Sequence, residues 1–390
     1  MHKLLSPFRQ SKLLNTLFLS NIFISFHYAL VIYINSSYLN NFFSETQVSA
    51  LYVIGSIVDT ILLLNASKIL EKIGGYKFTI YALIIEFLAT FGLLVSISPF
   101  LIGSFFLIHL ITISLLLFNM DVFVESLSKD AQTGGIRATY LTLTNITIVI
   151  TPSLIALFLI SNNFSYVYLL SALFLIPLFY FVKQFKKVKT SVVHHIDIKK
   201  TVLEYVNNNA LYNIFISQFL LQLFYAYMVI YVPLYLEKYV GFSWSEIGIM
   251  FTIMLLPFVL FELPVGELAD RKYGEKEFLT VGFIIMGLST LIISFMTARN
   301  FWMWTIVLFI TRVGASFVEI TTESYFFKHV NKEKTDVISF FRVSRPLSFI
   351  VAPLLASLSF QFIHFQYIFI IIGALMITGA HYSLALKDTR

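Results

Sequence analysis

Charged side chains interrupt several long apolar stretches of this 390-residue sequence. Asp59, Glu262 and Arg312 each lie within such a stretch, where an ionisable residue is costly and is by default a functional candidate. A carboxyl group in an apolar setting can take up and release a proton, so Asp59 and Glu262 are candidate proton-binding residues. Glu262 also has a structural interpretation, because it shares one helical face with Gly266 and Asp270. Arg312 is either an anchor for an anionic substrate group or a member of a buried ion pair, with Asp59 as one candidate partner.

Two other apolar stretches carry uncharged polar residues, which in the second of them fall at i, i+4 and i+7 on one helical face. The residues are Asn21, His27 and Tyr28 in the stretch at 14–34, and Gln218, Gln222 and Tyr225 in the stretch at 209–236. Amide, phenol and imidazole groups form hydrogen bonds with a neutral or amphipathic ligand, and they also form them with each other between helices. We predict that the two sets together bind substrate. His27 is in addition a candidate for proton movement, because imidazole titrates near physiological pH.

The stretches that hold these residues dominate the composition. Hydrophobic residues make up 58% of the chain and charged residues 12%, against about 25% charged residues in ordinary soluble proteins. A transmembrane helix needs about 20 predominantly apolar residues. Twelve stretches meet this length, at about 14–34, 46–66, 76–97, 101–126, 138–160, 164–183, 209–236, 246–266, 277–297, 301–325, 338–360 and 364–386. The sequence therefore predicts an all-α membrane protein with twelve transmembrane helices, and it leaves no room for a large soluble domain.

The longest break, at 184–208, is polar and basic. We predict that it is a cytoplasmic linker between an N-terminal six-helix bundle at 1–183 and a C-terminal six-helix bundle at 209–390. Lys and Arg gather in alternate breaks, in the linker and at both termini, whereas the other breaks hold only Lys238 and Arg299. Retention of basic loops in the cytoplasm therefore places both termini there. The same distribution explains the net charge of +6 without a nucleic-acid partner.

The two predicted bundles repeat one another in sequence. Three matches recur at one nearly constant spacing. Phe26, Val31, Ile32 and Tyr33 match Phe224, Val229, Ile230 and Tyr231, and Asp121 and Glu125 match Glu319 and Glu323. The third match pairs Ser67, Glu71, Lys72, Gly75 and Lys77 with Gly266, Asp270, Arg271, Gly274 and Lys276. Three matches in the same order indicate duplication of a six-helix unit. Because six is an even number, the two copies share one orientation, related by an axis along the membrane normal.

The break between the eighth and ninth stretches holds a recognisable motif, Gly266-Glu267-Leu268-Ala269-Asp270-Arg271-Lys272-Tyr273-Gly274-Glu275-Lys276. It resembles the loop signature G-x-L-a-D-r-x-G-r-k of the major facilitator superfamily, with one extra residue between Arg271 and Gly274. The resemblance extends to the whole chain through the six-plus-six layout and the basic central loop. It implies a secondary transporter that works by alternating access around a cavity between its halves. It also implies a cytoplasmic gate in which Asp270 and Arg271 act, on a motif completed by Gly266, Gly274 and Lys276.

Charges near the cytoplasmic ends of the fourth and tenth stretches are similar to the salt-bridge network of that family. They are Asp121, Glu125, Arg137, Glu319, Glu323, Arg342 and Arg345. We interpret them as structural ion pairs rather than as substrate ligands. Glu86, in the middle of the third stretch, receives no functional assignment, and His109 is interpreted as a packing residue.

Other chemistries lack support in the sequence. The motifs of metalloproteases, serine hydrolases and P-loop ATPases are absent, so the sequence predicts no enzyme activity and no metal or other cofactor. There is no cysteine, which excludes disulfides and thiolate-ligated metals. His194-His195 lies in the linker without a third ligand nearby and is interpreted as solvated loop.

The prediction is a proton-coupled transporter that acts as a monomer in the plasma membrane (the bacterial inner membrane), with a small-molecule substrate, protons and the lipid bilayer as its partners. An aromatic, modestly charged cavity favours export of amphipathic or hydrophobic compounds, and Pro152 in the fifth stretch is consistent with antiport. Uptake of a small polar or anionic solute held by Arg312 is the alternative. A third possibility is a non-transporting receptor or assembly factor, suggested by the poorer match of the first-half loop to the motif.

Overall fold

The computed structural model describes residues 12–127, 133–159, 163–188, 190, 198–329 and 335–387. Nearly all of them are helical, and twelve of the described helices are long and apolar enough to cross a membrane. The predicted all-α fold with twelve spans is thereby confirmed. The elements are α1 (Lys12–Ile32), α2 (Asn35–Asn40), α3 (Glu45–Ile73), α4 (Gly75–Val95), α5 (Pro99–Leu127), α6 (Thr133–Phe158), α7 (Ser165–Val182), η2 (Lys183–Lys187), α8 (Ile198–Asn207), α9 (Asn209–Leu234), η3 (Tyr235–Val240), α10 (Trp244–Leu268), η4 (Ala269–Tyr273), α11 (Glu275–Ile293), α12 (Phe301–His329), α13 (Thr335–Ser359), η5 (Phe365–Tyr367) and α14 (Ile368–Leu384).

Contacts divide the chain into two units. The first comprises Met1–Ser44 and Ile54–Val193, and the second comprises Glu45–Val53 and His194–Arg390. The beginning of α3 therefore groups with the second unit rather than with the N-terminal bundle. One reason is a hydrogen bond of 2.8 Å between the hydroxyls of Ser49 and Tyr231.

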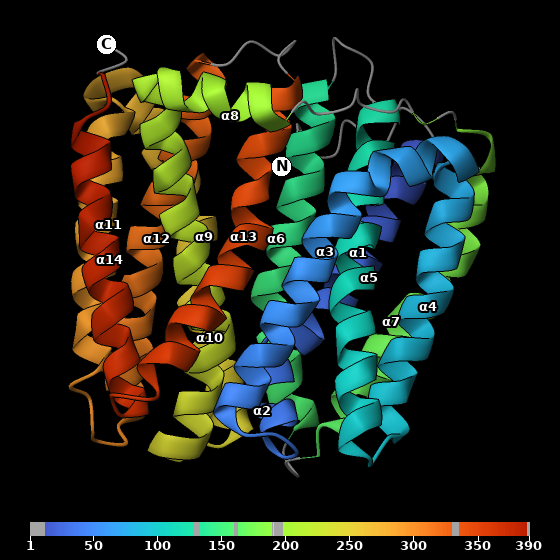
Figure 1. Cartoon of the computed structure of the whole chain (residues 1–390), viewed down its shortest axis with the longest axis horizontal. Helices are drawn as coiled ribbons and strands as arrows, with labels where there is room; N and C mark the ends of the chain where they lie inside the picture. Colours follow the sequence, from blue (N-terminus) through green and yellow to red (C-terminus); the bar gives the residue numbers. More distant parts are fainter. Residues whose placement is uncertain are drawn as a thin grey trace. The chain divides into compact units, whose positions relative to one another are not determined.

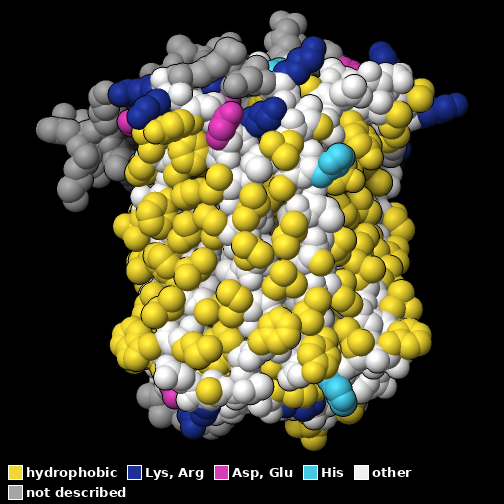
Figure 2. All heavy atoms as spheres, turned by 90° about the vertical axis from the view of Figure 1, so that its left-hand side faces the viewer, with side chains coloured by type: hydrophobic (Ala, Val, Ile, Leu, Met, Phe, Trp, Pro, Cys, Tyr) yellow, Lys and Arg dark blue, Asp and Glu magenta, His cyan; other side chains and the backbone are white. Residues whose placement is uncertain are grey.

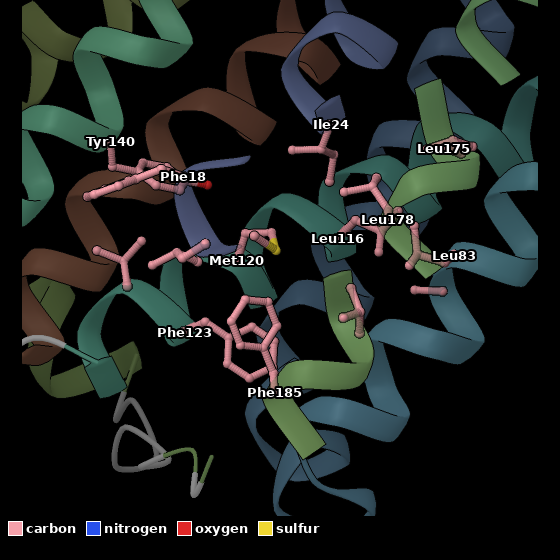
Figure 3. Close-up of a cluster of buried hydrophobic side chains, with 14 of the residues drawn as sticks. Phe18, Ile24, Leu83, Leu116, Met120, Phe123, Tyr140, Leu175, Leu178 and Phe185 are labelled. Atoms are coloured by element: carbon pink, nitrogen blue, oxygen red, sulfur yellow. The ribbon is translucent and has the colours of Figure 1, made fainter. Parts of the chain in front are cut away.

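In the first unit, α1 packs against α5, α6 and α7, while α4 packs against α5 and α7. Figure 3 shows the buried hydrophobic cluster between them, in which Phe18, Met120 and Phe123 lie near Tyr140 and Phe185. The rings of Phe123 and Phe185 stack with their centroids 4.8 Å apart. Lipid tails are as apolar as these side chains, so close packing rather than the hydrophobic effect holds such helices together.

In the second unit, α11 packs against both α12 and α14, and the three helices lie side by side (Figure 1). A Cβ atom added at Gly314 would lie 2.5 Å from the backbone nitrogen of Met286 and 2.7 Å from the carbonyl oxygen of Gly282. At the other crossing, a Cβ atom added at Gly373 would lie 2.9 Å from the carbonyl oxygen of Gly287. Glycine thus brings both neighbours of α11 into backbone contact, as in other membrane helix pairs.

The exposed faces of the helices are apolar. Figure 2 shows one such face, with hydrophobic side chains across its middle and Lys and Arg near its upper and lower ends. On α11, Val281, Leu288 and Ile292 are 46%, 51% and 48% exposed and recur at helical spacing. Apolar side chains at these positions suit contact with lipid, so the chemistry of the molecule must be sought inside the bundles.

The predicted linker at 184–208 is helical in its second part. Helix α8 packs against α9 and α13, and the hydroxyl of the buried Tyr205 donates to the carbonyl oxygen of Val337 at 2.8 Å. Burial, together with the nearby Glu204 carboxylate, raises the pKa of Tyr205 well above its usual value. The phenol therefore remains a donor at every physiological pH, and it ties the linker to α13.

A substitution at the crossing of α11 and α12 tests this packing. We expect Gly314→Ala to destabilise the protein by about 1–3 kcal/mol, because its Cβ would collide with backbone atoms that cannot rotate away. The measurement is the Tm of the detergent-purified protein.

Gly55→Ala is the matched control. Its Cβ would meet only side-chain methyl groups, with Leu107 and Leu110 at 3.2 Å. These side chains can adjust, so the control should change the Tm less. Equal Tm values for Gly314→Ala and the unmodified chain would contradict the backbone contact.

Candidate functional site

A short hydrogen bond joins α9 to α12 inside the second unit. The phenol of Tyr225 donates to Oε2 of Glu319 at 2.5 Å, and both side chains are partly buried. Hydrogen bonds to an ionised carboxylate are roughly twice as strong as bonds between neutral groups. The sequence assigned Tyr225 to substrate binding and Glu319 to a salt-bridge network, whereas the structure places the two side chains in one cluster.

Arg312 supplies the cation of this cluster. Its side chain is buried, at 2% exposure, and its guanidinium carbon lies 5.0 Å from the ring centre of Phe224 and 5.8 Å from that of Tyr225. Arg312 and Glu319 lie on the same side of α12, seven residues apart. Attraction between a desolvated guanidinium and an aromatic face is worth about 2 kcal/mol or more. A cation, two aromatic rings and a carboxylate thus meet on two helices.

Further charges act on Glu319. The carboxylate of Glu262 on α10 interacts with it electrostatically, as do the guanidinium groups of Arg342 and Arg345 on α13. Arg342 also donates to both carboxylate oxygens of Glu323, at 3.1 Å for Oε2 and closer for Oε1. The predicted proton-binding residue Glu262 and part of the predicted charge network therefore converge on one carboxylate. We call Tyr225, Glu262, Arg312 and Glu319 the second-unit cluster.

The amides of α9 differ in their surroundings. Gln218 is buried at 4% exposure, and its Oε1 accepts no hydrogen bond from any residue that the structure describes. Gln222, one turn later, is partly exposed. A buried polar atom without a partner is uncommon and calls for an explanation such as a bound ligand or water. Gln218 therefore stays a candidate ligand-binding residue.

The first unit contains a second buried cluster, built from His27 on α1, Glu86 on α4 and His109 on α5. Their exposures are 0%, 0% and 3%. Oε1 of Glu86 lies 2.8 Å from Nε2 of His27 and 2.5 Å from Nδ1 of His109. The other carboxylate oxygen, Oε2, accepts no hydrogen bond within the described part of the chain. We call these three residues the first-unit cluster.

Sequence reasoning missed the first-unit cluster. It gave Glu86 no role and took His109 for packing. A usable signal was present, because Glu86 and His109 lie at nearly equal distances from the short connection between α4 and α5. In antiparallel neighbours, residues at equal distances from the turn lie at the same depth. The pattern still left open which faces of the two helices meet.

The other predicted substrate-binding residues of α1, Asn21 and Tyr28, have partners inside the first unit. Nδ2 of Asn21 donates to the carbonyl oxygen of Tyr140 at 2.8 Å and lies 2.9 Å from the hydroxyl of Thr144. The ring of Tyr28 packs against the hydrophobic cluster of Figure 3. Both residues thus serve helix packing within the unit, and their role in substrate binding remains a prediction.

Several other predicted residues are described by their burial alone. Asp59 is buried in α3, and its predicted pairing with Arg312 would join the two units and stays a prediction. Asp121 and Glu125 are exposed on α5. The side chains of Arg137 and Asp270 lie outside the described residues, as does His194-His195.

The loop motif between α10 and α11 adopts an unusual helical form. Helix α10 continues into a π-helix, η4, which ends at Tyr273 and is followed by Gly274 with a φ of 89°. A π-turn accommodates one additional residue in a helix, which accounts for the extra residue between Arg271 and Gly274. Gly74 has the same position before α4, with a φ of 77°, so the structural counterpart of Gly274 is Gly74 rather than Gly75.

Contacts around the motif connect it to α12. A Cβ atom added at Gly266 would lie 3.3 Å from Cγ1 of Ile320, so the two helices approach closely there. The carboxylate of Glu275, which is 0% exposed, accepts hydrogen bonds from Ser324 at 3.0 Å and from Lys328. Arg271 is exposed and Lys276 is partly exposed.

Comparisons with known proteins agree with this architecture. The crystal structure of the nucleoside transporter NupG is similar over 96% of this chain and 99% of that chain, with a TM-score of 0.73 and 12% sequence identity. The structure of a point variant of NupG gives a TM-score of 0.72 and 13% identity over the same shares. No curated protein matches the sequence significantly.

The family comparison covers the chain almost from end to end. The model of the Major Facilitator Superfamily matches residues 17–245 and, a second time, residues 214–389. Two matches to one family fit the internal repeat of the sequence. The chain therefore belongs to the major facilitator superfamily, as its loop motif indicates, and is a multi-pass secondary transporter.

Proposed function

We propose that this transporter moves a small amphipathic molecule across the plasma membrane, that protons drive the movement, and that the second-unit cluster binds both. The observation that carries the proposal is the convergence of Tyr225, Glu262 and Arg312 on the Glu319 carboxylate within a largely apolar bundle. Such a site offers aromatic surface, a cation and exchangeable protons within a few ångströms.

The two carboxylates are the proposed proton carriers. Glu262 and Glu319 interact electrostatically, and two neighbouring carboxylates in a low dielectric do not readily both carry charge. The pair therefore suits binding of one proton in one state of the transport cycle and its release in another. Arg342 and Arg345 interact with Glu319 as well. A small movement of α13 would therefore change whether Glu319 is protonated or is ionised and paired with these arginines.

The aromatic rings and Arg312 suggest the class of substrate. A planar, partly polar molecule can stack on Phe224 or Tyr225 and form hydrogen bonds with Gln218, whose Oε1 is available among the described residues. Nucleosides combine an aromatic base with a polar sugar, and the similarly folded NupG is a nucleoside transporter. Nucleosides are therefore the first compounds to test within this class.

Export is the direction that we propose, from the aromatic composition of the spans and from Pro152 within α6. Uptake of a small anionic solute is the second candidate, and the burial of the Arg312 cation favours it. A purified chain that moves no solute in liposomes under any gradient would support a non-transporting role instead.

Proton coupling can be tested with Glu319→Gln. We expect the solute flux driven by an imposed pH gradient to be lower by about tenfold or more for this variant in liposomes than for the unmodified chain, since the amide cannot exchange a proton. Exchange of solute without a gradient should persist, because Gln keeps the shape of the side chain and can still accept a hydrogen bond from Tyr225.

Glu246→Gln is the control for that experiment. Glu246 lies in the first turn of α10 and pairs with Arg299 rather than with the second-unit cluster, so its loss should leave dependence on the pH gradient in place. The proposal fails if Glu319→Gln keeps full gradient-driven flux while the unmodified chain is proton-dependent.

The two substrate classes respond differently to changes at Arg312. Arg312→Lys keeps the charge and loses the planar group that lies over Phe224 and Tyr225. For an aromatic, neutral substrate we expect this change to weaken binding about tenfold, equivalent to about 1.4 kcal/mol. For a small anion we expect Lys to preserve binding and Ala to abolish it.

Binding is measured as the ligand-induced rise in Tm, since a ligand of the folded state stabilises it by mass action. Nucleosides and small carboxylic acids form the two arms of the screen. Equal affinity of the unmodified chain, Arg312→Lys and Arg312→Ala for every ligand found would place the substrate elsewhere.

A further inference from the structure

The first-unit cluster has the donor set of a metal site. Two imidazole nitrogens and one carboxylate oxygen, from α1, α4 and α5, lie within 4.8 Å of one another and are buried. Two His and one Glu are the ligands of many zinc centres, in which each donor atom lies at about 2 Å from the ion. Oε2 of Glu86 accepts no hydrogen bond from described residues and is a further donor of the same carboxylate.

The surroundings of His27 fix its protonation. Nδ1 of His27 lies 3.1 Å from the carbonyl oxygen of Ser171 on α7 and 2.8 Å from the hydroxyl oxygen of Ser171. That hydroxyl donates its own proton to the carbonyl oxygen of His27, at 3.0 Å. Both Ser171 oxygens are therefore acceptors towards Nδ1, and Nδ1 carries the proton. Metal-binding histidines are held in the same way, by a hydrogen bond from the ring nitrogen that is not a ligand.

In a neutral His27 this arrangement leaves Nε2 without a proton, so that Nε2 presents a lone pair. It points at Oε1 of Glu86 from 2.8 Å, and Oε1 is itself an acceptor. Two acceptors in a dry interior at this distance repel each other unless a positive charge lies between or beside them. The first-unit cluster therefore requires either an additional proton, on His27 or on Glu86, or a metal ion.

The described helices around the cluster supply no other cation near it. On the four helices that surround the cluster, α1, α4, α5 and α7, the basic residues besides histidine are Lys12 and Lys77, each in the first turns of its helix. The remaining ionisable acids of those helices, Asp121 and Glu125, lie in the last turns of α5 and are exposed. Glu86 thus has two histidines and the hydroxyl of Thr90, at 3.4 Å, as its described polar neighbours.

We propose that His27, Glu86 and His109 bind one divalent transition-metal ion of the zinc class, which clamps α1, α4 and α5 together in the first unit. Imidazole with carboxylate favours zinc and related ions over magnesium or calcium, whose preferred ligands are all oxygens. The site does not depend on the proposed transport chemistry, because none of its residues belongs to the second-unit cluster.

The test uses the full-length chain with an affinity tag that contains no histidine, purified in detergent and freed of metal with a chelator. Cobalt(II), zinc and magnesium are then titrated separately. We expect one equivalent of zinc to bind and to raise the Tm, cobalt to give the intense visible absorption of a low-coordinate nitrogen and oxygen site, and magnesium to do neither.

Glu86→Gln removes the charged ligand and keeps the volume of the side chain, and it should weaken zinc binding at least tenfold. His381→Gln, an exposed histidine on α14, is the matched control and should bind zinc like the unmodified chain. Should Glu86→Gln fail to fold, the cobalt spectrum of the unmodified chain decides by itself, because surface histidines do not produce it.

The proposal is overturned if the unmodified chain binds no stoichiometric zinc or cobalt. It is equally overturned if Glu86→Gln retains the affinity of the unmodified chain. In either case an additional proton, on an imidazole or on the Glu86 carboxyl, takes the place of the metal ion in the first-unit cluster.

Discussion

A polar atom inside a bilayer must find its partner within the chain, and this constraint shapes the whole structure. Along the spans, hydroxyls return to their own helix, as where Ser20 donates to the carbonyl oxygen of Thr16 at 2.8 Å and Thr151 to that of Thr147 at 2.7 Å. Amides reach across to a neighbour, as Asn119 does to the carbonyl oxygen of Gly75 at 3.0 Å. In the first-unit cluster the constraint is met only in part, because Oε2 of Glu86 accepts no hydrogen bond from the residues that the structure describes. The same holds for Oε1 of Gln218, on the helix that carries Tyr225. Function is therefore sought at these two places.

The same constraint explains why the helices can approach so closely. Each helix satisfies its own backbone, so two helices may touch at glycine without losing a hydrogen bond. The crossings of α11 with α12 and α14 use this freedom, with carbonyl oxygens of Gly282 and Gly287 against the facing glycines. Contacts of this kind make a unit rigid, because a backbone atom has no alternative rotamer. A rigid unit can hold a cluster such as Tyr225 and Glu319 in one geometry.

The sequence predicted the spans, the repeat and the family, because each depends only on the order of residue types along the chain. Hydropathy locates the twelve helices, and the motif at Gly266 to Lys276 identifies the family. It did not predict which charges meet. Glu319 looked like a salt-bridge residue and is joined to Tyr225, since the rotation of α9 against α12 decides the partner. Glu86 looked isolated for the same reason. The additional residue before Gly274 was visible, but its absorption in a π-turn required coordinates.

The two clusters share a position in the repeat and differ in chemistry. His27 and Tyr225 occupy equivalent places in the two halves of the sequence, and each holds a carboxylate inside its own unit. The carboxylate comes from α4 in the first unit and from α12 in the second. Glu86 has imidazoles beside it, whereas Glu319 has a phenol as donor and guanidinium groups in its field. Imidazoles can give up their protons to a metal ion, but a guanidinium remains charged and cannot be a ligand. The duplicated position is thus associated with two kinds of cation. In the first unit it is the proposed metal ion between helices, and in the second unit it is the guanidinium group of an arginine side chain.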